Sequence, residues 1–216
     1  MNKLILTFLF AAISLICFSQ DSLSYFLEYG KRPSKNNNYI DLLDNHNNHS
    51  KLPISIIKGT EPGPTLTIVA GVHGYEYPPI IAAQELIKEI QPEQVSGTLI
   101  IIPLANPNAF YNRTPFLNPQ DNLNLNRVFP GNSSGTITER IANFVTNKVI
   151  AKTDVFIDVH GGDANEDLLP FVCYYRNKSN PIQTNKAKLL SESSDFEYIV
   201  SYPYTCLLYT SPSPRD

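Results

Sequence analysis

The sequence predicts a single α/β domain with three layers, in which helices flank a mixed, largely parallel sheet. Short apolar runs of the length of strands alternate with amphipathic stretches of the length of helices. No internal repeat and no long linker interrupts this alternation. The segment 20–205 has the length of one domain with a core of its own, so we expect a single domain there.

Five apolar runs are expected to form the strands. The first alternates between apolar and polar residues and ends at the segment 58–64, which is dense in turn-forming residues. The others are almost continuously apolar, which is typical of strands that are buried on both faces. The runs span residues 52–57, 65–71, 98–104, 154–159 and 171–175.

Three amphipathic stretches are expected to form helices, at residues 80–90, 136–151 and 182–191. Pro78 and Pro79 precede the first stretch and suit a first helical turn, where the missing N–H of proline costs no hydrogen bond. Apolar residues recur along one face of the first two stretches. They are Ile80, Ala83, Leu86, Ile87 and Ile90 in one, and Ile137, Ile141, Phe144, Val145 and Val149 in the other.

The N-terminal end of the chain has the pattern of a secretory signal peptide. Residues 1–19 hold a lysine, an apolar run and the small residue Ser19 at the expected cleavage point. A membrane anchor is the alternative, but about 15 apolar residues are fewer than the roughly 20 that span a bilayer. We therefore expect an exported protein, periplasmic or secreted, without a membrane anchor after cleavage.

The C-terminal end has a different composition. Residues 206–216, with the sequence CLLYTSPSPRD, follow no periodicity and resemble a translated adapter tail that is not native to the protein. The alternative is a flexible natural terminus that is rich in proline and serine. With a non-native tail, the domain at residues 20–205 is expected to be incomplete at its C-terminal end.

Composition excludes two classes of site. The net charge is −3 and the basic residues are scattered, so we expect no nucleic-acid partner. Cys17 lies in the expected signal peptide and Cys206 in the expected tail, which leaves Cys173 as the one cysteine of the mature domain. This excludes a disulfide framework and a cysteine-based metal site.

Three potential metal ligands follow two of the expected buried strands. His73 and Glu76 come directly after the strand at 65–71, and His160 comes directly after the strand at 154–159. Ligands gather beyond the carboxyl ends of strands in open α/β sheets. Two histidines and a carboxylate that leave a position for water are a typical catalytic zinc site. Asp158 projects to the same side of its strand as His160 and is expected to orient a ligating imidazole.

The glycines after each histidine are expected to remove side-chain bulk and to permit positive φ, which lets the backbone bend sharply around an ion. Each motif alone is a weak signal, since His and Glu are ordinary residues at a helix start. Iron and other divalent ions accept the same ligands. His46 and His49 also form a histidine pair, but they lie in an asparagine-rich segment without acidic or cysteine neighbours in the pattern of a metal site.

The chain resembles the succinylglutamate desuccinylase/aspartoacylase family, a branch of the zinc carboxypeptidase superfamily. Four motifs carry the resemblance in the family's order, within residues 65–175. They are GVHGYE at 71–76, NPNAF at 106–110, NLNRVFPG at 124–131 and DVHGG at 158–162. The resemblance implies a zinc carboxypeptidase-like fold and one zinc ion held by His73, Glu76 and His160.

The resemblance also implies roles for polar residues in the middle of the chain. Asn126 and Arg127 match a pair that holds the carboxylate of the substrate, a role that suits the rigid fork of donors of arginine. A structural ion pair is the alternative for Arg127. Arg113 lies where relatives often have another catalytic arginine, and a surface arginine is its alternative.

The resemblance implies a hydrolase that cleaves an amide or ester bond next to a carboxylate, in N-acyl amino acids or peptides. The glutamate that relatives use as general base has no clear match before Thr205, and Glu166, Glu192 and Glu197 are the nearest candidates. Glu166 is the one closest to His160, with a solvated loop acid as its alternative. The rival functions are a non-catalytic metal- or ligand-binding protein that lacks the base, and a structural exported domain.

Overall fold

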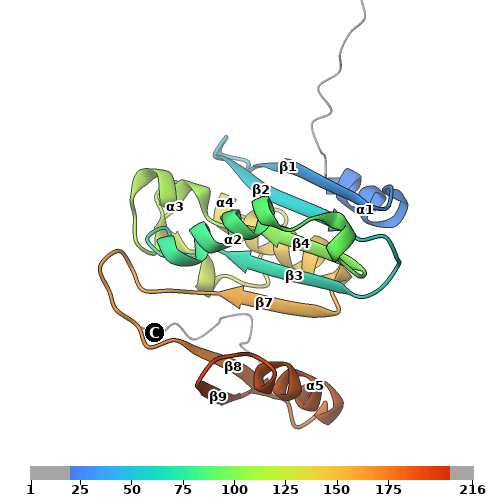
Figure 1. Ribbon diagram of the computed structural model, residues 1–216. Coiled ribbons are helices and arrows are strands. Elements are labelled where there is room, and N and C mark those ends of the chain that lie inside the picture. The colour runs from blue at the N-terminus through green and yellow to red at the C-terminus, as the bar shows by residue number, and fades with distance from the viewer. Residues whose placement is uncertain (1–19, 205–216) are drawn as a thin grey trace, which may run out of the picture.

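The computed structural model describes residues 20–204, and its centre is a five-stranded sheet (Figure 1). The strand order is β1-β2-β4-β3-β7. The strands are β1 (Ser34–Leu43), β2 (His49–Lys58), β3 (Thr65–Ala70), β4 (Thr98–Ile102) and β7 (Val155–Val159). The expected signal peptide at 1–19 and the expected tail at 206–216 lie outside the described residues.

The sheet is mixed, as expected, and four of its five strands, β1, β4, β3 and β7, run in the same direction, with β2 antiparallel to them. β1 and β2 form an antiparallel hairpin, and β2 also pairs with β4 in the antiparallel sense. Only β3 pairs in parallel with its neighbours, β4 on one side and β7 on the other. The hairpin accounts for the antiparallel pairings, because its second strand enters the sheet in the opposite direction to β4.

Helices cover both faces of the sheet (Figure 1). α2 (Tyr77–Glu89) packs on one face, where Ala83 meets Ile57, Leu99 and Ile101. α1 (Gln20–Tyr29) and α4 (Ile137–Phe144) pack on the other face, in the larger of the two apolar clusters. The expected helix at 136–151 begins as α4 and continues as a π-helical turn at Val145–Val149 and a 3₁₀ turn at Ile150–Lys152.

The connection between β4 and α4 contains short elements. It holds α3 (Pro107–Asn112), the two-residue strands β5 (Leu117–Asn118) and β6 (Leu123–Asn124), and a 3₁₀ turn at Leu125–Arg127. A further 3₁₀ turn at Pro92–Gln94 joins α2 to β4. No helix within residues 20–204 has the length and apolar character needed to cross a bilayer.

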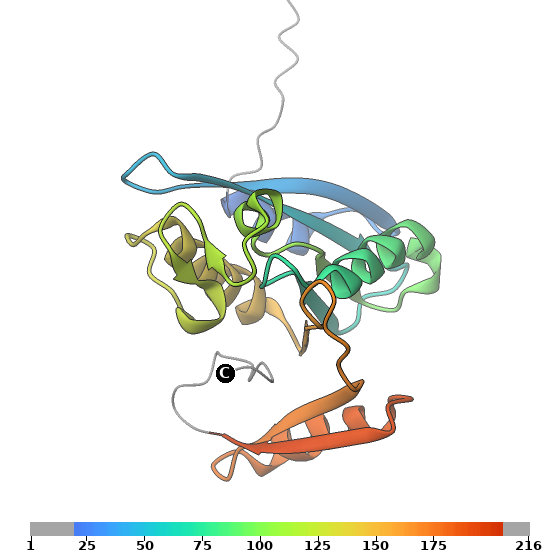
Figure 2. The ribbon, with the colours of Figure 1, turned by 90° about the vertical axis from the view of Figure 1, so that its left-hand side faces the viewer.

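The last described elements form a separate layer beside β7 (Figures 1 and 2). β8 (Phe171–Arg176) pairs in parallel with β9 (Tyr198–Pro203), and α5 (Pro181–Glu192) connects them. β7 was expected to be a buried strand, but it lies at the edge of the sheet, with Phe156 39% and Ile157 43% exposed.

The parallel part of the sheet positions the candidate site. Ala70 at the end of β3 is in register with Val159 at the end of β7, so the segments that follow these strands leave the sheet side by side. The segment after β4 joins them, because the backbone N–H of Asn106 donates to the carbonyl of Gly71 at 2.9 Å. All three loops therefore meet at one end of the sheet, beyond the carboxyl ends of β3, β4 and β7.

Candidate metal centre

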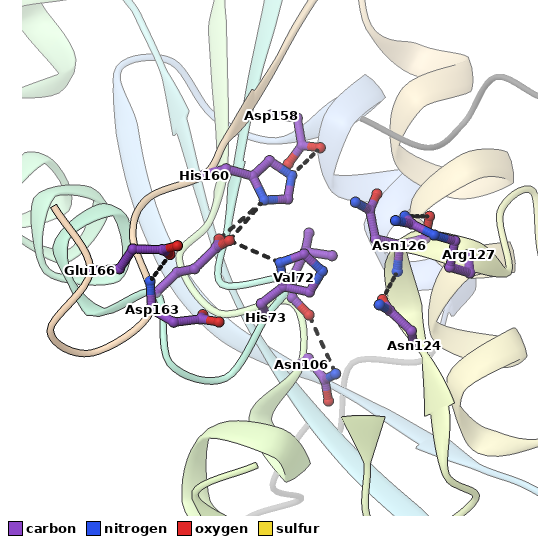
Figure 3. Close-up of polar contacts among 11 residues, drawn as sticks. Val72, His73, Asn106, Asn124, Asn126, Arg127, Asp158, His160, Asp163 and Glu166 are labelled. Carbon is purple, nitrogen blue, oxygen red and sulfur yellow. Dashed lines mark hydrogen bonds and ion pairs between the residues drawn. The ribbon is translucent and has the colours of Figure 1, made fainter. Parts of the chain in front are cut away.

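The structure brings His73, Glu76 and His160 together at the carboxyl ends of these strands (Figure 3). His73 lies in the turn after β3, Glu76 occupies the N-cap position of α2, and His160 directly follows β7. One ligand atom from each lies within 4.8 Å of the others, and they are the one such group of three within residues 20–204. His73 and Glu76 are almost completely buried, with 1% and 0% exposure.

The carboxylate of Glu76 faces both imidazoles (Figure 3). Its Oε1 lies 2.9 Å from Nδ1 of His73, and its Oε2 lies 3.1 Å from Nδ1 of His160. The two Nδ1 atoms and a carboxylate oxygen therefore converge on one point. Nitrogen and oxygen donors in this arrangement suit a divalent transition-metal ion.

The charges of the site also favour a cation. Although burial alone would lower it, the charge and hydrogen bond of Asp158, followed by those of Glu76, raise the pKa of His160 to about 10. Burial opposes ionisation of Glu76, yet hydrogen bonds from His160 and His73 hold its pKa below the ordinary value. Two carboxylates thus stabilise positive charge between them, which a bound metal ion would supply in place of the proton.

Asp158 orients His160 as expected. Its Oδ2 lies 3.0 Å from Nε2 of His160, on the side of the ring opposite Glu76 (Figure 3). A ligating histidine commonly uses its second nitrogen in this way. Nε2 of His73, in contrast, is buried and has no hydrogen-bond partner within the described part of the chain.

The glycines after the histidines remove side-chain bulk, as expected, but they do not use the positive φ that glycine permits. Gly71 has a φ of 67°, but Gly74, Gly161 and Gly162 are not among the residues with positive φ. A Cβ on Gly74 would lie 2.4 Å from the carbonyl oxygen of Thr114. A Cβ on Gly161 would lie 2.9 Å from Cδ of Pro79, at the start of α2. Missing side-chain bulk therefore lets the loops approach one another.

Asn126 and Arg127 lie in the 3₁₀ turn after β6, and Figure 3 draws the histidines between them and Glu166. Asn126 is buried, and its backbone N–H donates to Oδ1 of Asn124 at 2.9 Å. The guanidinium of Arg127 donates to the carbonyl of Asn126 at 3.2 Å.

Three further expectations concern polar side chains around the site. Arg113 is exposed and ends α3 with a φ of 55°, and the structure does not connect it to the histidines. Glu166 is exposed, and its carboxylate accepts from the backbone N–H of Asp163 at 3.2 Å. His49 lies at the start of β2, where it pairs with Asp41 at 3.0 Å, and His46 lies in the turn before it.

One contact with the site could not be expected from the sequence. The ring of Phe116 packs at right angles against the imidazole of His73, with 5.6 Å between the ring centroids and 87° between the planes. Phe116 lies between α3 and β5, in a segment without periodicity. No pattern in the sequence separates it from an ordinary loop residue.

The fold and the buried His-Glu-His group define a class of α/β proteins with a candidate metal site beyond the carboxyl ends of their strands. The chain belongs to the succinylglutamate desuccinylase/aspartoacylase family, because the catalytic domain of that family matches residues 62–204. This confirms the family that the four motifs indicated.

Individual relatives agree with this assignment. The chain is 39% identical over 122 residues to N-alpha-acetyl-L-2,4-diaminobutyric acid deacetylase of Halomonas elongata, over 56% of this chain and 34% of that protein. An aspartoacylase family protein from Mesorhizobium loti is 28% identical, with a TM-score of 0.71 over 79% of this chain and 54% of the other. The product-bound ectoine utilization protein EutE (DoeB) from Ruegeria pomeroyi is 27% identical, with a TM-score of 0.69 over 81% and 54%. The chain thus spans about half of these solved structures and about a third of the deacetylase.

Proposed function

We propose that this chain carries the metal site of a zinc-dependent hydrolase that cleaves an amide or ester bond next to a carboxylate. The single observation that carries the proposal is the convergence of Nδ1 of His73, Nδ1 of His160 and the carboxylate of Glu76. These three residues would hold one zinc ion. Zinc in such a site supplies Lewis acidity to the scissile carbonyl and lowers the pKa of a water molecule towards neutrality.

The residues around the triad would bind and orient the substrate. Arg127, through its fork of donors, and Asn126 beside it would bind the carboxylate of the substrate and so set the register of attack. Asp158 would hold His160 in the orientation that directs Nδ1 towards Glu76. Arg113 is a further candidate for a substrate contact, which its exposed position at the end of α3 leaves accessible.

The proposed substrate class is supported by the similarity to the Halomonas deacetylase and by the proposed carboxylate-binding role of Arg127 and Asn126. The name of the Halomonas relative describes removal of an acetyl group from an amino acid derivative, so N-acetyl amino acids are the first substrates to test. Peptides with a free C-terminus offer the same pair of amide and carboxylate. We also propose export, periplasmic or secreted, on the basis of the signal-peptide pattern in residues 1–19.

The second candidate is a metal- or ligand-binding protein without catalysis. One observation favours it: the carboxylates that contact the two histidines, those of Glu76 and Asp158, are both engaged with imidazoles. Neither is therefore placed to accept a proton from water. Glu166 is held by the backbone of Asp163 instead.

Metal analysis of the purified chain tests the proposal. We expect one equivalent of zinc, and we expect His73→Ala and His160→Ala each to lose it. Arg127→Ala is the matched control, because it should keep the zinc while binding N-acetyl amino acids more weakly. Full zinc retention in both histidine variants would remove the ligand assignment. Zinc binding without hydrolysis of any N-acyl amino acid or peptide would favour the second candidate.

A further inference from the structure

The two histidines of the site are oriented by different means. His160 has a polar partner on each nitrogen, with Glu76 at Nδ1 and Asp158 at Nε2. His73 has only Glu76, at Nδ1, because its buried Nε2 has no partner within the described residues. A ligating histidine usually donates its second N–H to a carboxylate, carbonyl or water, which fixes the rotation of the ring. His73 lacks that support.

The ring of Phe116 occupies the position of an orienting group for His73. The two rings are perpendicular, with an interplanar angle of 87° and a centroid separation of 5.6 Å. This edge-to-face arrangement is favourable for aromatic rings, and it opposes rotation of either ring about its side-chain bonds. The imidazole of His160 also approaches His73, at 5.3 Å and 53°. His73 therefore lies between the other histidine and Phe116.

Phe116 can act as a fixed support because the backbone next to it is attached to the metal-binding turn. The N–H of Gly74 donates to the carbonyl of Pro115 at 2.9 Å, directly beside His73. Thr114 is fixed in turn, since its N–H donates to Ala109 at 2.9 Å and its hydroxyl donates to the carbonyl of Leu117 at 2.6 Å. A Cβ on Gly74 would lie only 2.4 Å from the carbonyl oxygen of Thr114, so the two backbones are in close contact. The segment that carries Phe116 therefore has no room to shift towards the turn that carries His73.

We propose that Phe116 is a positioning residue of the metal centre, whose ring holds the His73 imidazole with Nδ1 directed at Glu76 and His160. The inference rests on the proposed function, because it assumes that the triad binds a divalent cation. A cation takes the electron pair of Nδ1 and so removes the one hydrogen bond that otherwise orients His73. The contact with Phe116 then sets the rotation of the ring.

Zinc affinity of variants of the whole chain tests this role. Phe116→Leu keeps the bulk and removes the aromatic ring, and we expect its zinc dissociation constant to rise about tenfold, as for other groups that orient a ligand. Phe116→Tyr keeps the ring and should restore the parent affinity. Phe110→Leu is the matched control, because Phe110 contacts Tyr77 and Tyr111 and no proposed ligand. Affinity is measured by competition with a chromophoric chelator.

A spectroscopic measurement separates positioning from a general loss of structure. With cobalt(II) in place of zinc, the visible absorption reports the arrangement of the ligands, and we expect Phe116→Leu to change the spectrum while Phe116→Tyr and Phe110→Leu do not. If Phe116→Leu does not fold, Phe116→Met replaces it in both measurements.

The outcomes distinguish this inference from the proposed function. A parent chain that binds no zinc would overturn both. A parent chain that binds zinc, with unchanged affinity and cobalt spectrum on loss of the ring, would overturn the role of Phe116 and leave the metal site intact. An equal loss of affinity in Phe110→Leu would also overturn it, because the effect would then belong to general packing.

Discussion

At the scale of single residues, the candidate metal centre places negatively charged side chains around an imidazole. Two carboxylates, Glu76 and Asp158, flank the imidazole of His160, and burial weakens the competition from water. Although burial lowers it, the pKa of His160 is raised to about 10 by Asp158 and Glu76, so a proton on His160 supplies the positive charge when no metal ion is bound. A metal ion therefore has to displace that proton.

This competition predicts that zinc binding releases about one proton at pH 7. His160 is protonated below its pKa of about 10, whereas zinc needs the free electron pair of Nδ1, so the apparent affinity should rise with pH by about tenfold per unit up to that pKa. Calorimetry in two buffers with different ionisation enthalpies measures the proton count. Asp158→Asn should reduce the release, because the charge of Asp158 holds the proton. Identical heats in both buffers would contradict the prediction.

Gly74 gives a second prediction at this scale. A Cβ at this position would lie 2.4 Å from the Thr114 oxygen and 2.6 Å from the Ala109 carbonyl carbon, both of which are backbone atoms. Gly74→Ala should therefore push the segment away from His73, lower the free energy of unfolding by about 1–3 kcal/mol and weaken zinc binding.

Urea unfolding and a zinc titration of Gly74→Ala measure the two effects. Gly135→Ala is the control, because the Cβ there would meet the carboxylate of Glu139, a movable side chain. Unfolding and zinc binding that match those of the parent would show that the turn tolerates a side chain at position 74.

At the scale of elements, Asp44 joins the β1–β2 hairpin to the start of α4. This carboxylate is 4% exposed, and it accepts from the N–H groups of His46 and Asn48 in the hairpin turn, at 2.8 and 2.9 Å. It also accepts from the N–H of Ile137 at 3.1 Å, in the first turn of α4. One side chain thus supplies acceptors to two elements that are far apart in the sequence.

Asp44→Ala is therefore expected to lower the free energy of unfolding by about 2–4 kcal/mol, because it leaves several buried N–H groups without an acceptor. Urea denaturation followed by circular dichroism measures the change. Asp41→Ala, in the same hairpin, is the control, since its pair with the exposed His49 should contribute less than about 1 kcal/mol. A loss of the same size in both variants would show that Asp44 does not join these elements.

The sequence predicts those elements whose apolar pattern is strong. The apolar runs correspond to β2, β3, β4, β7 and β8, and the helical stretches to α2, α4 and α5. β1 could not be found, because Lys35 and the three asparagines after it lack an apolar pattern, and its pairing with β2 makes it a strand. The antiparallel pairing of β2 with β1 and with β4 was not predicted, because periodicity gives no pairing direction.

The same distinction holds for the site. The convergence of His73, Glu76 and His160 was predictable, because each follows the end of a recognisable strand and parallel neighbours end at one edge. The contact of Phe116 with His73 depends on how a loop folds back, through the bond between Gly74 and Pro115. Such a contact has no periodic signal in the sequence.

At the scale of the whole molecule, the described elements differ in how many buried side chains they contain. The core lies on both faces of the sheet from β1 to β3, where most of the fully buried side chains are found. Beyond β3, the elements β7, β8, α5 and β9 contain almost no buried residue. β7 pairs with β3 on one side, and within the described residues its other edge has no strand partner.

An open edge strand with apolar side chains promotes association between chains. Ile157 lies in the middle of β7 and is 43% exposed. We expect the chain to self-associate in a concentration-dependent way, and we expect Ile157→Lys to reduce this about tenfold or more, because a lysine on an edge strand opposes pairing with a second strand. Sedimentation velocity over a range of concentrations measures the association constant.

Ile182→Lys is the control for the added charge, because Ile182 is 82% exposed and lies on α5, outside β7. It should leave the association constant nearly unchanged if pairing occurs through β7. Both variants should keep the zinc of the parent, since neither residue contacts the triad. A chain that stays monomeric at all concentrations, or an equal effect of both lysines, would show that the open edge of β7 does not drive association.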